Sequence, residues 1–193
     1  MYDVFSSYLK KLFNEISDDA INAFYNIVEL KEYKKGDLLI EHEKSNNKFF
    51  IIKSGLVASF IRNQDGSDFI RTIYKQFDEV ASLKSLITND KSSAAYKCLM
   101  DSEVFETTFE DFIKLSQDHK ELGILHIKVL EKTYLASEKR ITELSALDGT
   151  ERYLQLKKEI PNIDNLLPQY QIANYLNVTP VQLSRIRKKI FSK

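Results

Sequence analysis

The fold of this chain is decided near its C-terminal end by LPQYQIANYLNVTPVQLSRIRKKIF, which spans Leu167–Phe191. An apolar stripe at helical spacing comes first, made by Ile172, Ala173 and Leu176. Asn177 then stands where the chain must turn, and asparagine tolerates a positive φ better than most residues. The pattern predicts a short helix that ends in a tight turn.

A second helix is predicted directly after that turn. Thr179 can cap its start, and Pro180 suits the first turn because the missing N–H has no partner there. Leu183 and Ile186 begin its buried stripe, which Ile190 continues. Small residue, turn residue and core aliphatic follow one another at the spacing of a helix-turn-helix unit. The competing interpretation is a small helical subdomain with a solvated basic face.

Charge is distributed unevenly along a chain whose total is balanced. Lys plus Arg and Asp plus Glu number 28 each, so the formal net charge is zero. Residues 168–193 hold five Lys or Arg and no Asp or Glu, whereas residues 151–167 balance and residues 1–150 carry the opposing excess of acid. A basic segment on an acidic body is typical of a nucleic-acid contact confined to one end.

Several functional classes are disfavoured by composition. Cys98 is the only cysteine, which excludes an internal disulfide and a cluster held by several thiolates. The three histidines do not form a metal-spaced set, and no nucleophile elbow or phosphate loop is present, so neither a metal site nor an enzyme is expected. No signal peptide or membrane-length apolar run is seen, which predicts a cytoplasmic protein without membrane contact.

The rest of the chain changes period twice. The first 30 residues are predicted to be helical, and Ser17 followed by two aspartates marks a helix start. From Tyr33 to about Thr108 short β-rich runs alternate with turn residues, and Asp65-Gly66 is typical of a hairpin. The predicted strands are Asp37–Glu41, Lys48–Lys53, Leu56–Arg62, Ser67–Lys75, Ala94–Met100 and Glu103–Thr108. Together they predict an antiparallel β-roll or barrel, with a short helix or irregular turn at Val80–Thr88.

A long helix is predicted next, over Lys120–Leu147, after a short one at Phe109–Leu115. The long helix carries more apolar surface than one small roll can cover, which favours a seam with a second copy over a helix lying across its own domain. A further helix at Glu151–Ile160 and a loop at Asn162–Leu167 lead into the helix-turn-helix. We therefore expect an α+β protein with three parts: an effector domain at 1–118, a dimerisation helix at 119–147 and a DNA-binding domain at 148–193.

This order of parts resembles the Crp/Fnr family of bacterial transcription regulators. In the roll the resemblance rests on residues 33–39, on residues 49–57 and on Asp65-Gly66, which match glycine-marked turns of a cyclic-nucleotide-binding domain. In the tail it rests on Ile172-Ala173 and on residues 183–189. The resemblance implies a homodimer that binds double-stranded DNA and places the second helix of each motif in a major groove.

Base contacts in the family come from the start of that helix, which implies Pro180, Val181 and Arg185 here. Arg185 agrees with the family, whereas Val181 stands where glutamate is common and can instead contact a thymine methyl group. The residues expected to contact DNA are Thr179, Val181, Gln182, Ser184, Arg185, Arg187, Lys188 and Lys189.

The resemblance also locates a candidate ligand pocket. Family members that bind cyclic AMP use Gly-Glu and an arginine, but Ala81-Ser82 and Ser92-Ser93 stand at those places here. The pocket residues are expected to be Ala81, Ser82, Leu83, Lys84, Ser92 and Ser93. Lys84 is the cation of this set, but a lysine does not reproduce the bidentate hydrogen bonds that an arginine makes to a phosphate. Cyclic AMP is therefore not the expected effector, and no cofactor is expected. An unknown small-molecule effector stays open, as does the alternative function of a small-molecule-binding signalling module with no specific role in DNA binding.

Overall fold

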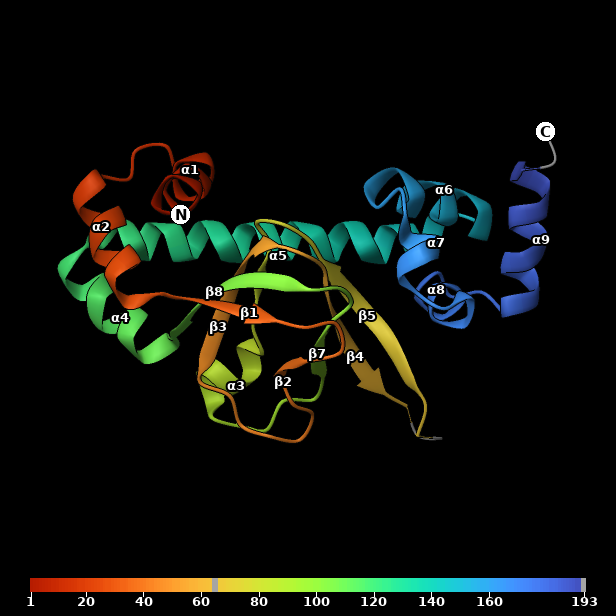
Figure 1. Ribbon diagram of the computed structural model, residues 1–193, viewed down its shortest axis with the longest axis horizontal. Coiled ribbons are helices and arrows are strands. Elements are labelled where there is room, and N and C mark those ends of the chain that lie inside the picture. The colour runs from red at the N-terminus through yellow and green to blue at the C-terminus, as the bar shows by residue number, and fades with distance from the viewer. Residues whose placement is uncertain (64–65, 192–193) are drawn as a thin grey trace. The chain divides into compact units, whose positions relative to one another are not determined.

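A computed structural model describes residues 1–63 and 66–191 (Figure 1). The chain divides into two compact units. The first comprises Met1–Ser59 and Ile73–Thr133, and the second comprises Phe60–Thr72 and Tyr134–Lys193. The predicted boundaries at residues 118 and 147 remain predictions.

Helices at the N-terminal end pack into the main core of the first unit. They are α1 (Tyr2–Leu12) and α2 (Asp18–Ile27), joined there by α4 (Phe109–Asp118) and the start of α5 (Lys120–Ala146). Ser17 caps α2 as predicted, since its hydroxyl accepts a hydrogen bond from the amide of Ala20. Large side chains from all four helices are buried together, among them Phe5, Phe24, Phe112 and Leu122. This burial explains why amphipathic helices flank the strands.

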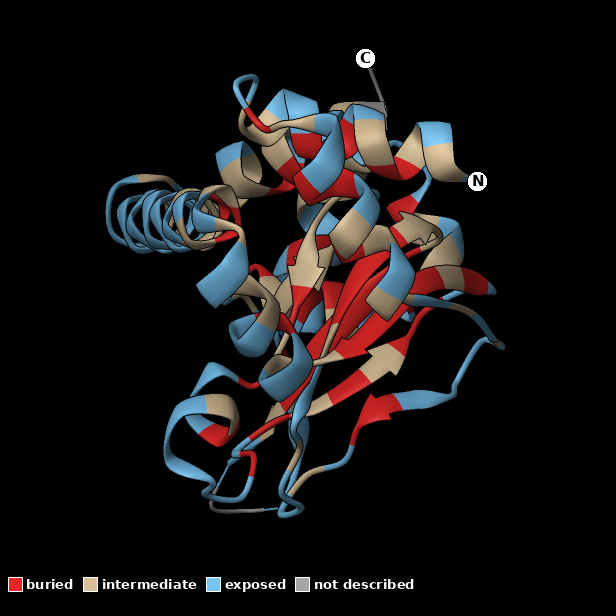
Figure 2. Cartoon of the chain, turned by 90° about the vertical axis from the view of Figure 1, so that its left-hand side faces the viewer, coloured by how far each residue is buried: buried red, intermediate tan, exposed pale blue. Residues whose placement is uncertain are grey.

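The strands form two four-stranded sheets, with orders β1-β8-β3-β6 and β2-β7-β4-β5. Buried residues are concentrated in these strands (Figure 2). The strands are β1 (Glu29–Tyr33), β2 (Leu38–Ile40), β3 (Lys48–Ser54), β4 (Val57–Arg62), β5 (Asp68–Tyr74), β6 (Glu79–Val80), β7 (Ala95–Cys98) and β8 (Ser102–Thr108). The pairings of β8 with β1 and β3, and of β2 with β7, are antiparallel, as predicted. The predicted turn at Asp65-Gly66 lies partly outside the described residues.

Two strands were not predicted, and the predicted end of the N-terminal helical region is wrong. The helical prediction for the first 30 residues fails at its end, because α2 stops at Ile27 and Val28 is already extended. β1 follows, and its five residues all pair with β8. β6 is a two-residue strand that pairs with Phe50 and Ile51 of β3. The segment predicted as a short helix or irregular turn divides into β6 and α3 (Leu83–Thr88).

One tight turn, between β3 and β4, depends on a glycine. Gly55 has φ of 106°, a conformation that other residues rarely adopt. A Cβ atom built on it would lie 2.1 Å from Oγ and 2.7 Å from Cα of Ser102. That serine is itself held, because its hydroxyl accepts from the amide of Leu56 and donates to the carbonyl of Met100. Ser102, the first residue of β8, therefore lies so close to Gly55 that no side chain fits between them.

The second unit contains the C-terminal helices. They are α6 (Gly149–Glu159), α7 (Ile163–Leu166), α8 (Gln169–Tyr175) and α9 (Pro180–Phe191). The loop predicted at Asn162–Leu167 is wrong in part, since α7 occupies its centre. Asp148 caps α6, and Glu151 returns a hydrogen bond to the amide of Asp148, which completes a capping box. The buried core of this unit is made by Tyr153, Leu156, Ile163, Leu167, Ile172, Ala173, Leu176 and Leu183.

Helix α5 is long and mostly exposed. It ends one residue before the predicted Leu147, and only Leu122 and Leu125 of its residues are buried. Its exposed apolar residues include Ile127, Leu130, Tyr134, Ile141 and Leu144, at spacings of three, four, seven and three. Within the described residues no helix combines the length and the apolarity that a membrane span requires.

Candidate nucleic-acid interface

Helices α8 and α9 form the predicted helix-turn-helix. Asn177 takes the left-handed conformation expected of the turn residue, with φ of 53°. The amide of Val178 donates to the carbonyl of Ala173 across the turn, at 3.0 Å. Ala173 is completely buried, as is Leu183 on α9. A small residue at the crossing thus lets the two short helices approach, and the apolar contacts fix α9 on the unit.

The start of α9 is closed by a pair of side chains that the sequence analysis assigned to DNA. The hydroxyl of Thr179 accepts from the amide of Gln182 at 3.1 Å, and the side-chain oxygen of Gln182 accepts from the amide of Thr179 at 2.8 Å. This reciprocal arrangement is a capping box. Both side chains are thereby engaged with the helix itself, so their first role is to define where α9 begins.

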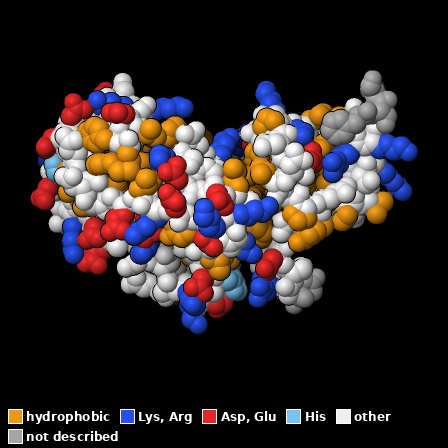
Figure 3. Space-filling view, in the orientation of Figure 1, with side chains coloured by type: hydrophobic (Ala, Val, Ile, Leu, Met, Phe, Trp, Pro, Cys, Tyr) orange, Lys and Arg blue, Asp and Glu red, His pale blue; other side chains and the backbone are white. Residues whose placement is uncertain are grey.

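The remaining predicted contacts, except Arg187, lie on an exposed face of α9. Val181 is 61% exposed, and Ser184, Arg185, Lys188 and Lys189 are also exposed. Figure 3 shows Lys and Arg side chains gathered over α9. Among the described residues, the guanidinium of Arg185 has no hydrogen-bond or ion-pair partner. A helix with a capped start, a small apolar side chain and an available guanidinium fits the requirements for reading base edges in a major groove.

Arg187 lies apart from that face. Its side chain is 33% exposed, and its Nη1 lies 3.7 Å from Oδ1 of Asp164 on α7, whose side chain is 13% exposed. Oδ2 of Asp164 accepts from the hydroxyl of Tyr153 at 2.8 Å and from Nζ of Lys157 at 2.9 Å. Burial alone would raise the pKa of Asp164, but the hydrogen bonds and neighbouring cations outweigh it and lower that pKa. Burial and the bond to Asp164 raise the pKa of Tyr153 to about 12.

Two arginines that the sequence analysis did not single out brace α8. Nε of Arg152 donates to the carbonyl of Leu176, at the end of α8, over 2.8 Å. The guanidinium of Arg140 lies 4.1 Å from the ring centre of Tyr175 and donates to its carbonyl. Cations at a helix C-terminus satisfy carbonyl groups that have no partner in the helix. No periodicity in the sequence marks these residues, because their partners are backbone atoms distant in the chain.

The predicted ligand-pocket residues are largely engaged with the protein. Ser92 is fully buried, and its hydroxyl donates to the carbonyl of Ala94. Ser82 is also buried, at the start of α3, and the carbonyl of Ala81 accepts from the hydroxyl of Tyr96. Nζ of Lys84 lies 3.3 Å from Oδ2 of Asp90, and the side chains of Leu83 and Ser93 are exposed.

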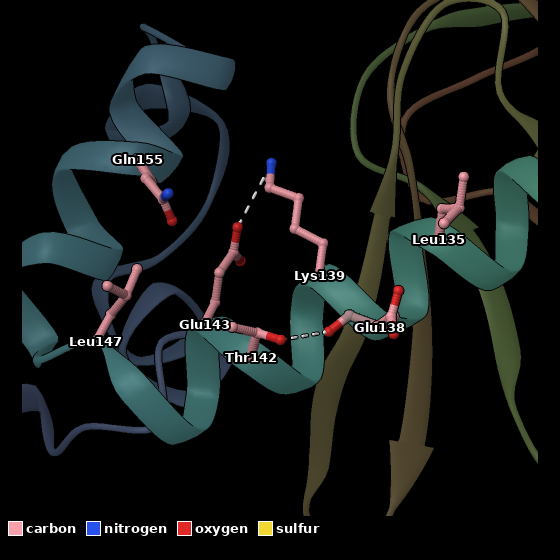
Figure 4. Close-up of a pocket in the computed structure, with 7 residues that line it drawn as sticks. All are labelled: Leu135, Glu138, Lys139, Thr142, Glu143, Leu147 and Gln155. Carbon is pink, nitrogen blue, oxygen red and sulfur yellow. Dashed lines mark hydrogen bonds and ion pairs between the residues drawn. The ribbon is translucent and has the colours of Figure 1, made fainter.

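Cavities of about 420 Å³ and 190 Å³ lie elsewhere, and none of the predicted pocket residues lines either of them. The first belongs to the second unit (Figure 4), and it is lined by Leu135, Glu138, Lys139, Thr142, Glu143, Leu147 and Gln155. Lys139 forms ion pairs with two carboxylates at this cavity. Its Nζ lies 3.4 Å from Glu143, which lines the cavity, and 2.7 Å from Glu159. The second is lined by residues of β1, β3 and β8 and of the turn before β8.

Comparison with known proteins supports the same organisation. A family model described as the cyclic nucleotide-binding domain matches residues 30–119. The cAMP-activated global transcriptional regulator CRP of Escherichia coli O6:H1 is 26% identical over 141 residues, which cover 72% of this chain and 66% of that relative. The chain is thus similar to a cyclic nucleotide-binding domain over residues 30–119 and, over most of its length, to regulators of the Crp/Fnr family.

Solved structures of such regulators have the same fold. The c-di-GMP responsive global regulator CLP of Xanthomonas campestris matches with a TM-score of 0.71 at 14% identity, over 91% of this chain and 92% of that one. A Crp/Fnr-family regulator from Eubacterium rectale, described as putative, also gives 0.71, at 13% identity over 94% and 86% of the two chains. This chain thus shares their β-roll, long helix and C-terminal helices, and the α+β prediction is confirmed.

Proposed function

We propose that this protein is a homodimeric regulator of transcription that binds specific DNA sequences through α9. The exposed face of α9, with Arg185 available and the helix start closed by its own capping box, is the observation that carries the proposal. In this assignment Arg185 bonds a guanine, Val181 contacts a thymine methyl group, and Lys188 and Lys189 lie near backbone phosphates.

The exposed apolar residues of α5 support the dimer. Their spacing repeats after seven residues, which is the pattern of a seam between two paired helices. A two-fold dimer with one α9 per protomer would contact two half-sites about 34–36 Å apart, one helical turn of DNA.

The roll supports a regulator whose effector is not cyclic AMP. Ser92 stands where the phosphate-binding arginine of cyclic-AMP-binding relatives would be expected, and its hydroxyl is committed to the backbone. Lys84 faces Asp90, so its charge is already balanced. The effector, if the protein has one, is therefore proposed to be a different small molecule.

Selection from a random pool of duplex DNA at low salt tests the proposal. We expect an enriched sequence with two half-sites, which the protein binds more tightly than a scrambled duplex of the same length. Replacing Arg185 by Ala should weaken binding of the enriched duplex by about 1–3 kcal/mol and relax the choice of one base. Replacing Lys189 by Ala should weaken binding of both duplexes equally.

Two outcomes count against it. If no sequence is enriched over bulk DNA, the protein is better described as a signalling module without a specific role in DNA binding. Equal losses for Arg185→Ala on the enriched and scrambled duplexes would make Arg185 a phosphate contact instead of a base contact.

A further inference from the structure

Helix geometry separates Arg187 from the other cations of α9. At about 100° per residue, Arg187 lies about 40° from the buried Leu183 around the helix, whereas Arg185 lies about 160° from it. The two arginines therefore point to different sides, and exposure agrees, since Arg187 is half-buried and Arg185 is exposed. Arg187 therefore lies close to the buried side of α9, beside Asp164, and not on the face that carries Arg185.

Asp164, the ion-pair partner of Arg187, is largely buried and is contacted by polar side chains of neighbouring helices. Asp164 receives groups from two helices besides its own, with Tyr153 and Lys157 of α6 bonded to Oδ2. Oδ1 is buried and has no hydrogen-bond partner among the described residues, and Arg187 is the cation that approaches it, at 3.7 Å. Burial of a carboxylate oxygen without a hydrogen bond or a counter-charge costs free energy. The ion pair of Asp164 with Arg187 is therefore stronger than an ion pair between exposed side chains.

We propose that Asp164 withholds Arg187 from DNA, so that the recognition helix contacts phosphates with fewer cations than its sequence carries. The inference rests on the proposed DNA binding by α9. Arg187 becomes a positioning residue that ties α9 to α7, and Asp164 sets the number of phosphate contacts. Since each neutralised phosphate contributes about 0.9 to the slope of log K against log salt, this number can be measured.

Salt titrations of the protein on a random-sequence duplex test the proposal without knowledge of the operator. Arg187→Ala should leave the slope at its wild-type value, because no phosphate contact is lost. Lys189→Ala, the matched control on the same helix, should make the slope shallower by about 1.8 for the two protomers. Asp164→Asn should free Arg187 and steepen the slope by up to about 1.8, which is about a tenfold larger loss of affinity between about 50 and 200 mM salt.

Two further variants separate release of Arg187 from a general change of charge. The double variant Asp164→Asn/Arg187→Ala should return to the wild-type slope. Glu138→Gln changes the charge of the same unit by the same amount at an exposed residue and should leave the slope unchanged. Thermal melts establish which variants fold, and if Asp164→Asn does not, the comparison of Arg187→Ala with Lys189→Ala still decides.

The inference is overturned if Arg187→Ala flattens the slope as much as Lys189→Ala does, or if folded Asp164→Asn keeps the wild-type slope. Failure of the proposed function is a different result, in which the wild-type protein shows no salt-dependent binding of the duplex at all.

Discussion

Replacing Gly55 by Ala tests the close approach between the β3–β4 turn and β8. Two costs add at this position. The first is the positive φ of 106°, which costs an L-residue about 1–2 kcal/mol. The second is overlap, because the new Cβ would lie 2.7 Å from the backbone Cα of Ser102. Overpacking of this kind costs about 1–3 kcal/mol, so the total is about 2–5 kcal/mol.

Gly36 provides the matched control. Its φ is 97°, and a Cβ atom built on it would have no neighbour within 4 Å. Gly36→Ala therefore carries the conformational cost alone, about 1–2 kcal/mol. For a chain of this size 1 kcal/mol corresponds to about 2–4 °C in Tm, so we expect a decrease of about 2–8 °C for Gly36→Ala and about 4–20 °C for Gly55→Ala.

Differential scanning calorimetry of both variants gives the comparison. Equal decreases in Tm would refute the steric part of the reasoning. Adding Ser102→Ala to Gly55→Ala should not restore the Tm to the level of Gly36→Ala, because the Cβ and Cα overlaps remain and the amide of Leu56 loses its acceptor. Full restoration would place the whole clash in the serine hydroxyl.

Three other outcomes are expected. Changing Leu130 and Leu144 to Asp should give monomers in sedimentation equilibrium, because both belong to the exposed apolar stripe of α5, and a dimer of unchanged strength would place the interface elsewhere. Micromolar cyclic AMP should leave the Tm unchanged, whereas a site filled at 100 times its Kd would add about 2.7 kcal/mol, which a melt detects. Burial lowers the pKa of His126 below 6.5, so the unfolded chain binds more protons there and stability should fall as pH drops below about 6.5; His126→Phe should reduce that loss, and an unaltered pH profile would contradict the assignment.

Much of the fold could be predicted from periodicity, because the segments concerned bury one side of a regular pattern. α9 and its turn are the clearest example, because the residue types there indicate the roles. Leu183 is buried, Asn177 takes the positive φ of the turn, and Thr179 caps the helix. β1 was missed for the opposite reason. Its sequence, Glu-Leu-Lys-Glu-Tyr, has no fully buried residue, and pairing with β8 defines it as a strand. No local pattern records a pairing partner more than 60 residues away.

The candidate site was predicted less completely than the fold. Sequence indicates which residue types of α9 are suited to contact DNA, but whether a cation is available depends on its neighbours in space. Arg187 has the residue type of a DNA contact, yet Asp164, in a segment predicted as a loop, lies beside its guanidinium. Gln182 likewise has a side chain suited to bases and is engaged with the amide of Thr179. Such competition within the protein becomes visible only once the helices are placed.

In the DNA complex proposed above, the capping box at the start of α9 limits how many side chains can contact bases. The side chains of Thr179 and Gln182 are bonded to the backbone at the start of α9. The base contacts proposed for each half-site are therefore those of Val181 and Arg185, one methyl contact and one guanidinium. Two proposed base contacts are simple to change. Exchanging Val181 and Arg185 would redirect the protein to a new set of promoters, because the cap, the turn and the core of the unit would stay unaltered.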